Sequence, residues 1–209
     1  MSTKYRFNPS PWGTHKIILS LLGKNQRVLD LGCASGYLGH HDEGKNIFYG
    51  LESDPRAAEQ ARKTGYYQRV VNKDLAALTK KDFVGQTFDI IIAADILEHL
   101  KNPQKTLAFL NKNFLKKKGK IIISLPNIAH LTIRLKLLTG KFPLQETGIL
   151  DKTHLHFYTL KTAQKLIENS DLKIERVIFS SNRFGRLINH WPFLGPLLGF
   201  NLIFLCTKK

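Results

Sequence analysis

The stretch RVLDLGCASG, residues 27–36, decides how the rest of the chain is interpreted. Its first part, Val28 to Leu31, is apolar apart from Asp30, and a run of small residues from Gly32 to Gly36 follows directly. An apolar run that ends at glycines is typical of a buried parallel strand followed by a tight loop. Glycine permits positive φ and the close approach of a ligand. Ligands of open α/β sheets bind beyond the carboxyl ends of the strands, so we expect a nucleotide-like ligand over this loop.

The spacing of the small residues separates classes of nucleotide. The dinucleotide fingerprint G-x-G-x-x-G is absent, because Gly32, Ala34 and Gly36 form G-x-A-x-G and Tyr37 follows them. This spacing resembles the first motif of class I S-adenosylmethionine (SAM) methyltransferases, in which an acidic residue at the strand end precedes G-x-G-x-G. Ala34 departs from that motif by one methyl group. A strand-to-helix turn that binds nothing is the alternative for this stretch alone.

Acidic residues at two later positions extend the resemblance. Glu52 follows the apolar run IFYGL, and an acid at the end of the second strand accepts hydrogen bonds from both hydroxyls of a ribose, in NAD and SAM alike. Asp74 and Leu75 follow an expected strand over residues 67–71, where the resemblance implies contacts with adenine. Asp74 is equally suited to cap an expected helix over residues 75–81.

The run FDIIIAA, residues 88–94, is apolar enough for a strand buried on both faces. It resembles the fourth motif of the same methyltransferases, where small residues pass close to the methionine part of SAM. The motifs cover residues 27–124, and SLPN through ILDKTHLHFYT resembles a bacterial group related to methionine- and ubiquinone-biosynthesis methyltransferases. The resemblance implies SAM as cofactor and S-adenosyl-L-homocysteine (SAH) as product. The residues implied to bind it are Asp30, Gly32, Ala34, Gly36, Glu52, Ser53, Asp74, Leu75, Ala94 and Asp95.

The implied α/β fold is one domain over residues 1–209, with a Rossmann-like, seven-stranded, mostly parallel sheet flanked by helices. Its last strand is expected to be antiparallel, and a helical insertion follows the fifth strand. Residues 1–24 form an expected arm and helix that cover the cofactor, with Trp12 and His15 either in that cover or packed at its edge. Residues 127–158 form the insertion, which is expected to lie over the acceptor site.

Local patterns predict further elements. Asp54 and Pro55 favour the start of a helix over residues 55–63, and apolar residues at 128, 131, 135, 138 and 142 have helical spacing. The lysine cluster of residues 112–120 fits a helix end and its turn, because cations suit a helix carboxyl end. Residues 181–200 are rich in aromatic residues, Gly and Pro, and predict no regular element.

Histidine is the natural general base near neutral pH. His154, in the insertion, is the first candidate, and His99, just past the fourth expected strand, is the second; a structural, hydrogen-bonded histidine is the alternative for each. Asp95, Glu98 and His99, with the later His154, are similar to an E-x-x-E-H pattern of some small-RNA 2′-O-methyltransferases that bind a divalent metal. Asp95 is shorter than the glutamate of that pattern, and no metal is expected.

The chain carries a formal net charge of +16. Such a charge suits an anionic partner, either nucleic acid or a lipid surface, although dispersed lysines on a solvated surface explain it equally well. The expected function is transfer of a methyl group from SAM to a small-molecule or glycan acceptor, at oxygen. The alternatives are an RNA methyltransferase and a membrane-surface binding module on a methyltransferase fold. A lipid-linked acceptor reconciles the charge with the apolar insertion.

The cellular location is expected to be the cytoplasm, with peripheral association at a membrane. Cys33 and Cys206 have no metal-ligand spacing. No apolar run reaches the ~18 residues that a membrane span needs, and the first residues carry no signal-like pattern.

Overall fold

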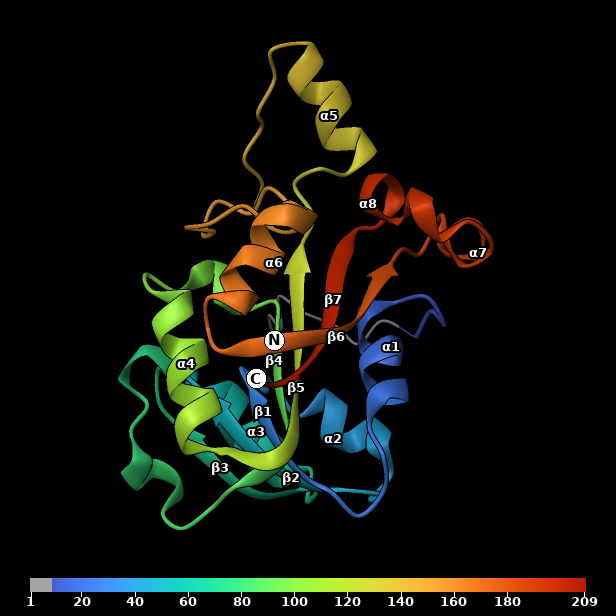
Figure 1. Cartoon of the computed structure of the whole chain (residues 1–209). Coiled ribbons are helices and arrows are strands. Elements are labelled where there is room, and N and C mark those ends of the chain that lie inside the picture. Colours follow the sequence, from blue (N-terminus) through green and yellow to red (C-terminus); the bar gives the residue numbers. More distant parts are fainter. Residues whose placement is uncertain (1–8) are drawn as a thin grey trace.

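A computed structural model describes residues 9–209 (Figure 1). The part of the expected arm that falls on residues 1–8 lies outside this range. The chain forms a seven-stranded sheet with the order β3-β2-β1-β4-β5-β7-β6. Neighbouring strands are parallel except for β7, which runs antiparallel to both β5 and β6. The predicted Rossmann-like sheet with an antiparallel last strand is confirmed.

The strands are β1 (Arg27–Leu31), β2 (Ile47–Glu52), β3 (Tyr67–Asn72), β4 (Phe88–Ala94), β5 (Leu115–Pro126), β6 (Leu172–Ser180) and β7 (Asn201–Lys208). The α-helices are α1 (Thr14–Leu21), α2 (Tyr37–Asp42), α3 (Pro55–Lys63), α4 (Pro103–Asn113), α5 (Leu131–Leu138), α6 (Leu160–Glu168), α7 (Gly185–His190) and α8 (Gly195–Leu198). The 3-10 segments are η1 (Leu75–Ala77), η2 (Lys80–Phe83), η3 (Leu97–His99) and η4 (Pro192–Leu194).

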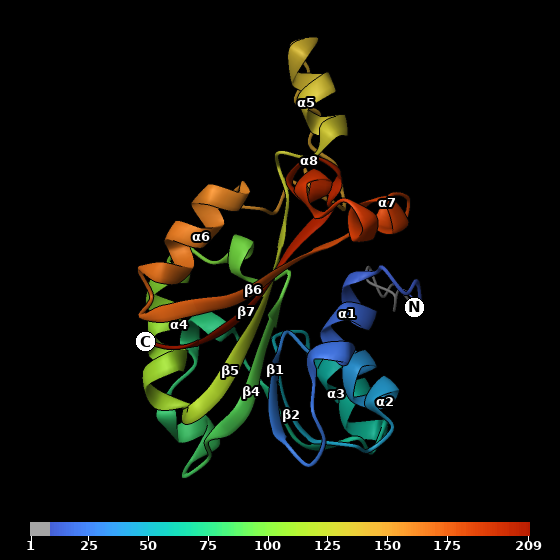
Figure 2. The same cartoon turned by 45° about the vertical axis from the view of Figure 1, so that its right-hand side comes forward.

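Helices cover both faces of the sheet. Figure 2 shows α1, α2 and α3 on one side and α4 and α6 on the other. Each side has its own core: Ile18 and Ala61 belong to one buried cluster, and Leu107 and Ile167 to the other. Helices on both faces leave the strand ends as the accessible edge of such a sheet.

Several elements begin and end where the sequence predicts. β4 spans the apolar run 88–94, and α3 begins at Pro55 behind Asp54, whose carboxylate accepts hydrogen bonds from the amides of Arg56 and Ala57. Thr159 caps α6 through its hydroxyl, which accepts from the amide of Thr162. These caps satisfy amide groups that have no partner inside the helix.

Three predictions were wrong in detail. Residues 75–81 form no α-helix; η1 and the start of η2 occupy them, separated by two residues. The lysine cluster 112–120 is mostly strand, because β5 begins at Leu115, and Lys116 pairs with Asp89 at 2.8 Å. Residues 181–200 contain α7, η4 and α8, packed through glycines whose close contacts the sequence pattern does not report.

The insertion projects away from the sheet. α5 is shorter than the apolar spacing predicts, and Figure 1 shows it standing clear of the body of the molecule. Ile133 is buried, whereas Leu135 and Leu138 on the expected stripe are 53% and 82% exposed. Among residues 9–209, no helix combines the length and apolar character that crossing a membrane requires.

Candidate functional site

Two adjoining cavities lie at the carboxyl ends of β1, β2, β3 and β4. They enclose about 380 and 240 Å³ and share Gly32, Ser53, Ile96 and His99. Their position fits the rule that ligands of such sheets bind at this edge, near the switch in strand order. The expected cofactor residues that line them are Asp30, Gly32, Ala34, Glu52, Ser53, Asp74, Leu75, Ala94 and Asp95.

The loop after β1 adopts left-handed backbone geometry at two positions on the cavity wall. Gly32 has φ +68° and Ala34 has φ +46°. A Cβ at Gly32 would lie 2.8 Å from Cδ1 of Ile96. Only glycine adopts this region at no cost, which explains why the resembled motif has glycine where this chain has Ala34.

Glu52 ties the loop to the end of β2. One of its carboxylate oxygens accepts a hydrogen bond from the amide of Ala34 at 2.9 Å, and the other accepts from the amide of Asp54 at 2.8 Å. The Ser53 hydroxyl also donates to Oε1 at 3.4 Å, so one of the about four lone-pair sites of the carboxylate remains, on Oε2. A rotation of the Ser53 hydroxyl would free a second site, on Oε1, for a ligand in the first cavity. This geometry suits a pair of ribose hydroxyls.

Gly36 lies behind the cavity wall. It is buried against Ala61 and the ring of Tyr67, and it does not belong to the lining of either cavity. Next to it, the Tyr67 hydroxyl donates to Asp30 at 2.7 Å. Burial is the main cause that raises the pKa of Asp30 to about 7; the Tyr67 hydrogen bond opposes this shift and the charge of Glu52 adds to it.

Asp95 lines the first cavity and Asp74 lines the second. Asp95 has φ +51°, and its Oδ1 accepts hydrogen bonds from the Ser124 hydroxyl at 2.7 Å and from the side-chain amide of Asn201. Strained backbone of this kind is concentrated at functional sites. Asp74 accepts from the amide of Ala76 at 2.7 Å and also lines the second cavity, so it serves as a cap and as part of the wall.

The N-terminal cover is formed by one of its two expected residues. His15, on α1, lines the first cavity, and burial lowers its pKa. Trp12 packs against Gly185 instead, where a Cβ would come within 2.2 Å of its ring. Tyr37, at the start of α2, also lines the first cavity. Sequence reasoning missed Tyr37, although its place just after the glycine loop marks it as a neighbour of the ligand.

The two candidate bases lie together, but only one reaches the cavities. The ring centroids of His99 and His154 are 4.8 Å apart, and His99 lines both cavities. His154 lies behind it with its side chain 5% exposed, and its Nε2 is 3.9 Å from Oε1 of Glu98. His99 is therefore the better placed of the two to meet an acceptor.

Glu98, which the sequence singled out only within the E-x-x-E-H pattern and not as an expected site residue, is buried beside these histidines. Its side chain is 1% exposed, and neither carboxylate oxygen has a hydrogen-bond partner within the described part of the chain. Burial, together with the charges of Asp95 and Asp151, raises the pKa of Glu98 well above its ordinary value. Glu98, His99 and His154 are also a group whose ligand atoms lie close enough to hold a metal.

The charge of the first cavity selects among ligands. Asp30, Glu52, Asp54 and Asp95 belong to its lining, and no Lys or Arg of residues 9–209 does. Phosphate groups prefer cationic side chains, so this lining disfavours a dinucleotide. It fits a nucleoside that carries positive charge, as SAM does at its sulfonium and amino groups. The volume of the first cavity, about 380 Å³, lies in the range of about 300–1,000 Å³ typical of ligand sites.

Comparison with known families gives one match over most of the chain. The model of the family described as "Methionine biosynthesis protein MetW" matches residues 13–198. A ribosomal protein L11 methyltransferase of Paraburkholderia phymatum is 33% identical over 103 residues, which are 48% of this chain and 32% of the relative. A ubiquinone biosynthesis O-methyltransferase of Glaesserella parasuis is 30% identical over 133 residues, 60% of this chain and 55% of the relative. The chain thus spans between a third and about half of these relatives.

Solved structures share the fold over nearly the whole chain. The magnesium protoporphyrin IX methyltransferase of Synechocystis PCC 6803, solved with SAH bound, superposes with a TM-score of 0.67 at 18% identity. The match covers 94% of this chain and 82% of that one. A TehB-like SAM-dependent methyltransferase of Corynebacterium glutamicum gives 0.62 at 17% identity, over 97% of this chain and 89% of the other. The fold is therefore that of class I SAM-dependent methyltransferases.

Proposed function

This chain belongs to the MetW family, and from that premise we propose that it is a SAM-dependent methyltransferase that acts on a hydroxyl oxygen of a small-molecule or glycan acceptor. The observation that carries the proposal is the first cavity, at the carboxyl ends of the parallel strands, with four carboxyl groups and no Lys or Arg of the described residues in its lining. This lining suits a cationic nucleoside and not a dinucleotide phosphate.

The chain's own residues bind and orient the cofactor in this account. Glu52 accepts hydrogen bonds from the ribose hydroxyls, and Asp74 and Leu75 hold the adenine in the second cavity. Asp30 and Asp95 provide the acidic surroundings of the methionine part. When bound, SAM supplies a methyl group already activated by its sulfonium. The protein's task is mainly alignment, which contributes about 7–11 kcal/mol in well-oriented systems.

The acceptor side of the site is the wall that holds His99. Its ring is accessible from both cavities, and its Nδ1 lies 3.2 Å from the carbonyl oxygen of Thr153. Because a carbonyl only accepts, this contact places the proton on Nδ1 and the lone pair on Nε2. Nε2 of His99 then takes the proton of the acceptor hydroxyl, a step worth about 100- to 10,000-fold in rate. His154 packs against His99 from behind.

A lipid-linked acceptor fits the shape and surface of the insertion. α5 and the turn after it carry three exposed apolar side chains. The exposed fractions are 49% for Leu137, 82% for Leu138 and 44% for Phe142. Arg134 and Lys141 are exposed on the same projection. Apolar and basic residues together favour the surface of an anionic membrane. We therefore place the protein peripherally at such a membrane, with residues 127–158 over the acceptor site.

A nucleic-acid acceptor is the second candidate, and the net charge of +16 favours it. Lysines and arginines that neutralise phosphates give binding that weakens steeply with salt. The exposed apolar projection has no role in that case, which is why the lipid-linked acceptor ranks first.

One experiment separates these acceptors. The purified chain is incubated with methyl-labelled SAM and, in separate reactions, with a bacterial lipid extract, water-soluble glycans or total RNA. Label in the lipid or glycan fraction supports the proposal. Absence of label when the hydroxyl groups of that fraction are blocked by O-acetylation before the incubation supports methylation at oxygen. Label in nuclease-sensitive RNA alone overturns the acceptor class. Label in no fraction, with SAH bound tightly, contradicts all three acceptors.

A further inference from the structure

Three metal-ligating side chains meet beside the first cavity. One ligand atom from each of Glu98, His99 and His154 lies within 4.8 Å of the other two. η3 supplies Glu98 and His99, and the loop before α6 supplies His154. The amide of Leu155 donates to the carbonyl oxygen of Glu98 at 2.8 Å, which fixes this loop against η3. The backbone therefore holds the group together across two distant parts of the chain.

Glu98 is the side chain of this group that a bound cation would stabilise most. It is 1% exposed, and both carboxylate oxygens lack a hydrogen-bond partner within residues 9–209. Buried carboxylates in proteins are paired, hydrogen-bonded or bound to a metal, because an isolated one is costly. Asp95, three residues earlier, does have hydrogen-bond partners, because its Oδ1 accepts hydrogen bonds from Ser124 and Asn201.

Both histidines have the orientation of metal ligands. Nδ1 of His99 lies 3.2 Å from the carbonyl oxygen of Thr153, and Nδ1 of His154 lies 3.2 Å from that of Ile149. A carbonyl oxygen accepts only, so each Nδ1 carries the proton and each Nε2 carries the lone pair. Metal-binding histidines are generally held by such a contact at the second ring nitrogen.

Two further side chains, Thr153 and Asp151, hold the His99 ring from the side away from the cavities. The Thr153 hydroxyl, also 3.2 Å from Nδ1 of His99, donates to the buried carboxylate of Asp151 at 2.6 Å. A hydroxyl that donates to a carboxylate keeps its lone pairs for the histidine proton. This arrangement fixes the ring plane of His99 while it faces the cavities.

We propose that Glu98, His99 and His154 bind a divalent transition-metal ion of the Zn²⁺, Mn²⁺ or Fe²⁺ type. Two imidazole nitrogens and one carboxylate favour these ions over Mg²⁺ and Ca²⁺. Ligand atoms about 2.1 Å from a tetrahedral ion lie about 3.4 Å from one another. The ligand atoms lie within 4.8 Å of one another, so side-chain rotation must bring them closer when an ion binds.

Such a site would act on the acceptor. Three protein ligands leave at least one coordination position open, as in catalytic metal sites, and His99 lines both cavities. A hydroxyl that binds a divalent ion releases its proton to water more readily, so coordination replaces the base role of His99 in the metal-loaded protein. This use in methyl transfer rests on the proposed function, whereas the binding of the ion does not.

The test measures metal binding directly. The full chain is freed of metal with a chelator, desalted, and titrated with Co²⁺ while its visible absorption is followed, and with Zn²⁺ in a calorimeter. One ion per chain is expected. The substitutions Glu98→Gln, His99→Asn and His154→Asn should each weaken binding about 100-fold or more. Thr153→Val, which removes only the hydroxyl behind His99, should weaken it about 10-fold.

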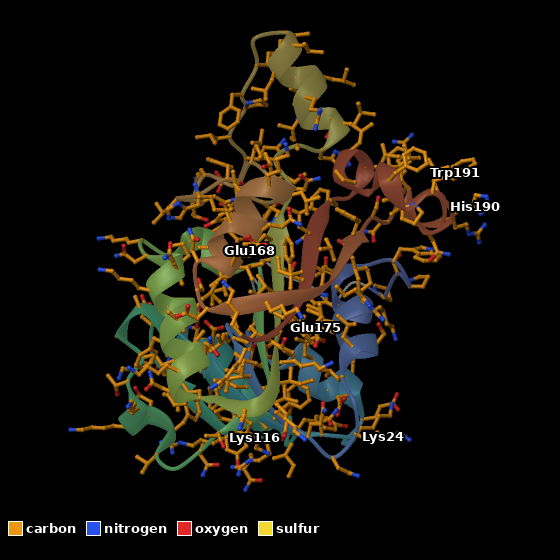
Figure 3. The ribbon with its side chains drawn as sticks, in the orientation of Figure 1. Lys24, Lys116, Glu168, Glu175, His190 and Trp191 are labelled. Atoms are coloured by element: carbon orange, nitrogen blue, oxygen red, sulfur yellow. The ribbon has the colours of Figure 1, made fainter. Side chains whose placement is uncertain are left out.

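Two histidines serve as matched controls. His156 lies on the same loop as His154, but its Nε2 contacts the carbonyl oxygen of Leu100 at 2.9 Å. His190 is exposed at the end of α7, where Figure 3 labels it. The variants His156→Asn and His190→Asn should bind the ion with wild-type affinity. An equal loss in either control would identify binding at surface histidines and overturn the proposal.

The remaining outcomes are distinguishable. Because His154 is buried, its substitution can disturb the fold, so near-UV circular dichroism and SAH affinity are recorded for every variant. His99→Asn tests metal binding at a more accessible position. If the chain binds SAH but no ion at micromolar concentration, or if His99→Asn binds as tightly as the wild type, the metal site is contradicted and the proposed function stands. If it binds the ion but not SAH, the metal site stands and the proposed function fails.

Discussion

The Tyr67 hydroxyl donates a hydrogen bond of 2.7 Å to Oδ2 of Asp30, beneath the loop that begins at Gly32. The ring reaches Asp30 across β2 because the residues along its path are glycines: a Cβ at Gly39 would lie 2.5 Å from it, and one at Gly50 would lie 3.1 Å away. Both partners are buried. The hydrogen bond therefore links β3 to β1 directly behind the proposed cofactor site.

Removing the hydroxyl alone tests this link. Tyr67→Phe keeps the ring but leaves the buried Asp30 carboxyl without its side-chain donor. We expect the free energy of unfolding to fall by about 1–3 kcal/mol, measured by urea denaturation at neutral pH. Tyr66→Phe is the matched control, because Tyr66 is 39% exposed, and it should change stability by less than about 0.5 kcal/mol. Equal effects of the two substitutions would contradict the assigned role.

Asp30 gives the fold a defined dependence on pH. Burial raises its pKa from 3.8 to about 7, so the folded state holds this proton more tightly than the unfolded chain does. The contribution of Asp30 to stability is therefore full below about pH 4 and is lost as pH rises through 7, by about 4 kcal/mol at most. In Asp30→Asn that loss should be absent. Urea unfolding of both proteins from pH 4 to pH 8 checks it, and parallel curves would refute it.

Ala34 has a conformation that glycine would adopt more easily. Because its φ is +46°, we expect Ala34→Gly to raise the free energy of unfolding by about 1 kcal/mol and to leave SAH affinity intact. Gly32→Ala is the opposite test: its φ is +68°, and the new Cβ would lie 2.8 Å from Ile96. It should destabilise the fold and weaken SAH binding. Thermal unfolding and calorimetry measure both, and a destabilised Ala34→Gly would contradict the strain argument.

Glu52 should make the largest single side-chain contribution to nucleoside binding. Glu52→Ala removes the acceptor proposed for two ribose hydroxyls and also the hydrogen bond to the amide of Ala34. At about 1.5–3 kcal/mol for a charged hydrogen bond, SAH should bind about 10- to 150-fold more weakly. Glu59→Ala on the exposed face of α3, where Glu59 pairs with Arg62 and Lys63, controls for the loss of charge. SAH affinity unchanged in Glu52→Ala would remove Glu52 from the site.

The sequence predicted the sheet well because its signals are local. The run 88–94 is apolar throughout, and Asp54 with Pro55 marks the start of α3 by capping chemistry alone. The lysine cluster 112–120 was wrongly assigned to a helix end and its turn. A lysine side chain reaches water from a strand as easily as from a helix end, so its presence does not distinguish the two. There, Leu115 and Gly119 are buried while the lysines between them are exposed or half-buried.

The parts of the candidate site that follow from sequence motifs were predictable. The part that depends on contact between two distant segments of the chain was not. The loop after β1 and Glu52 follow from motif spacing, and the structure places both on the first cavity. The burial of Glu98 beside His154 follows instead from backbone hydrogen bonds between η3 and a loop far along the chain. Gly36 belongs to the motif but packs behind the wall, since its neighbour Tyr67 comes from another strand.

The most direct measurement is a calorimetric titration of the purified chain with SAH, with NAD as the control ligand. The account predicts one SAH bound per chain with micromolar affinity and no heat with NAD, because carboxyl groups, and no Lys or Arg of the described residues, line the first cavity. Binding of NAD, or of neither ligand, would contradict the assignment of this cavity to SAM.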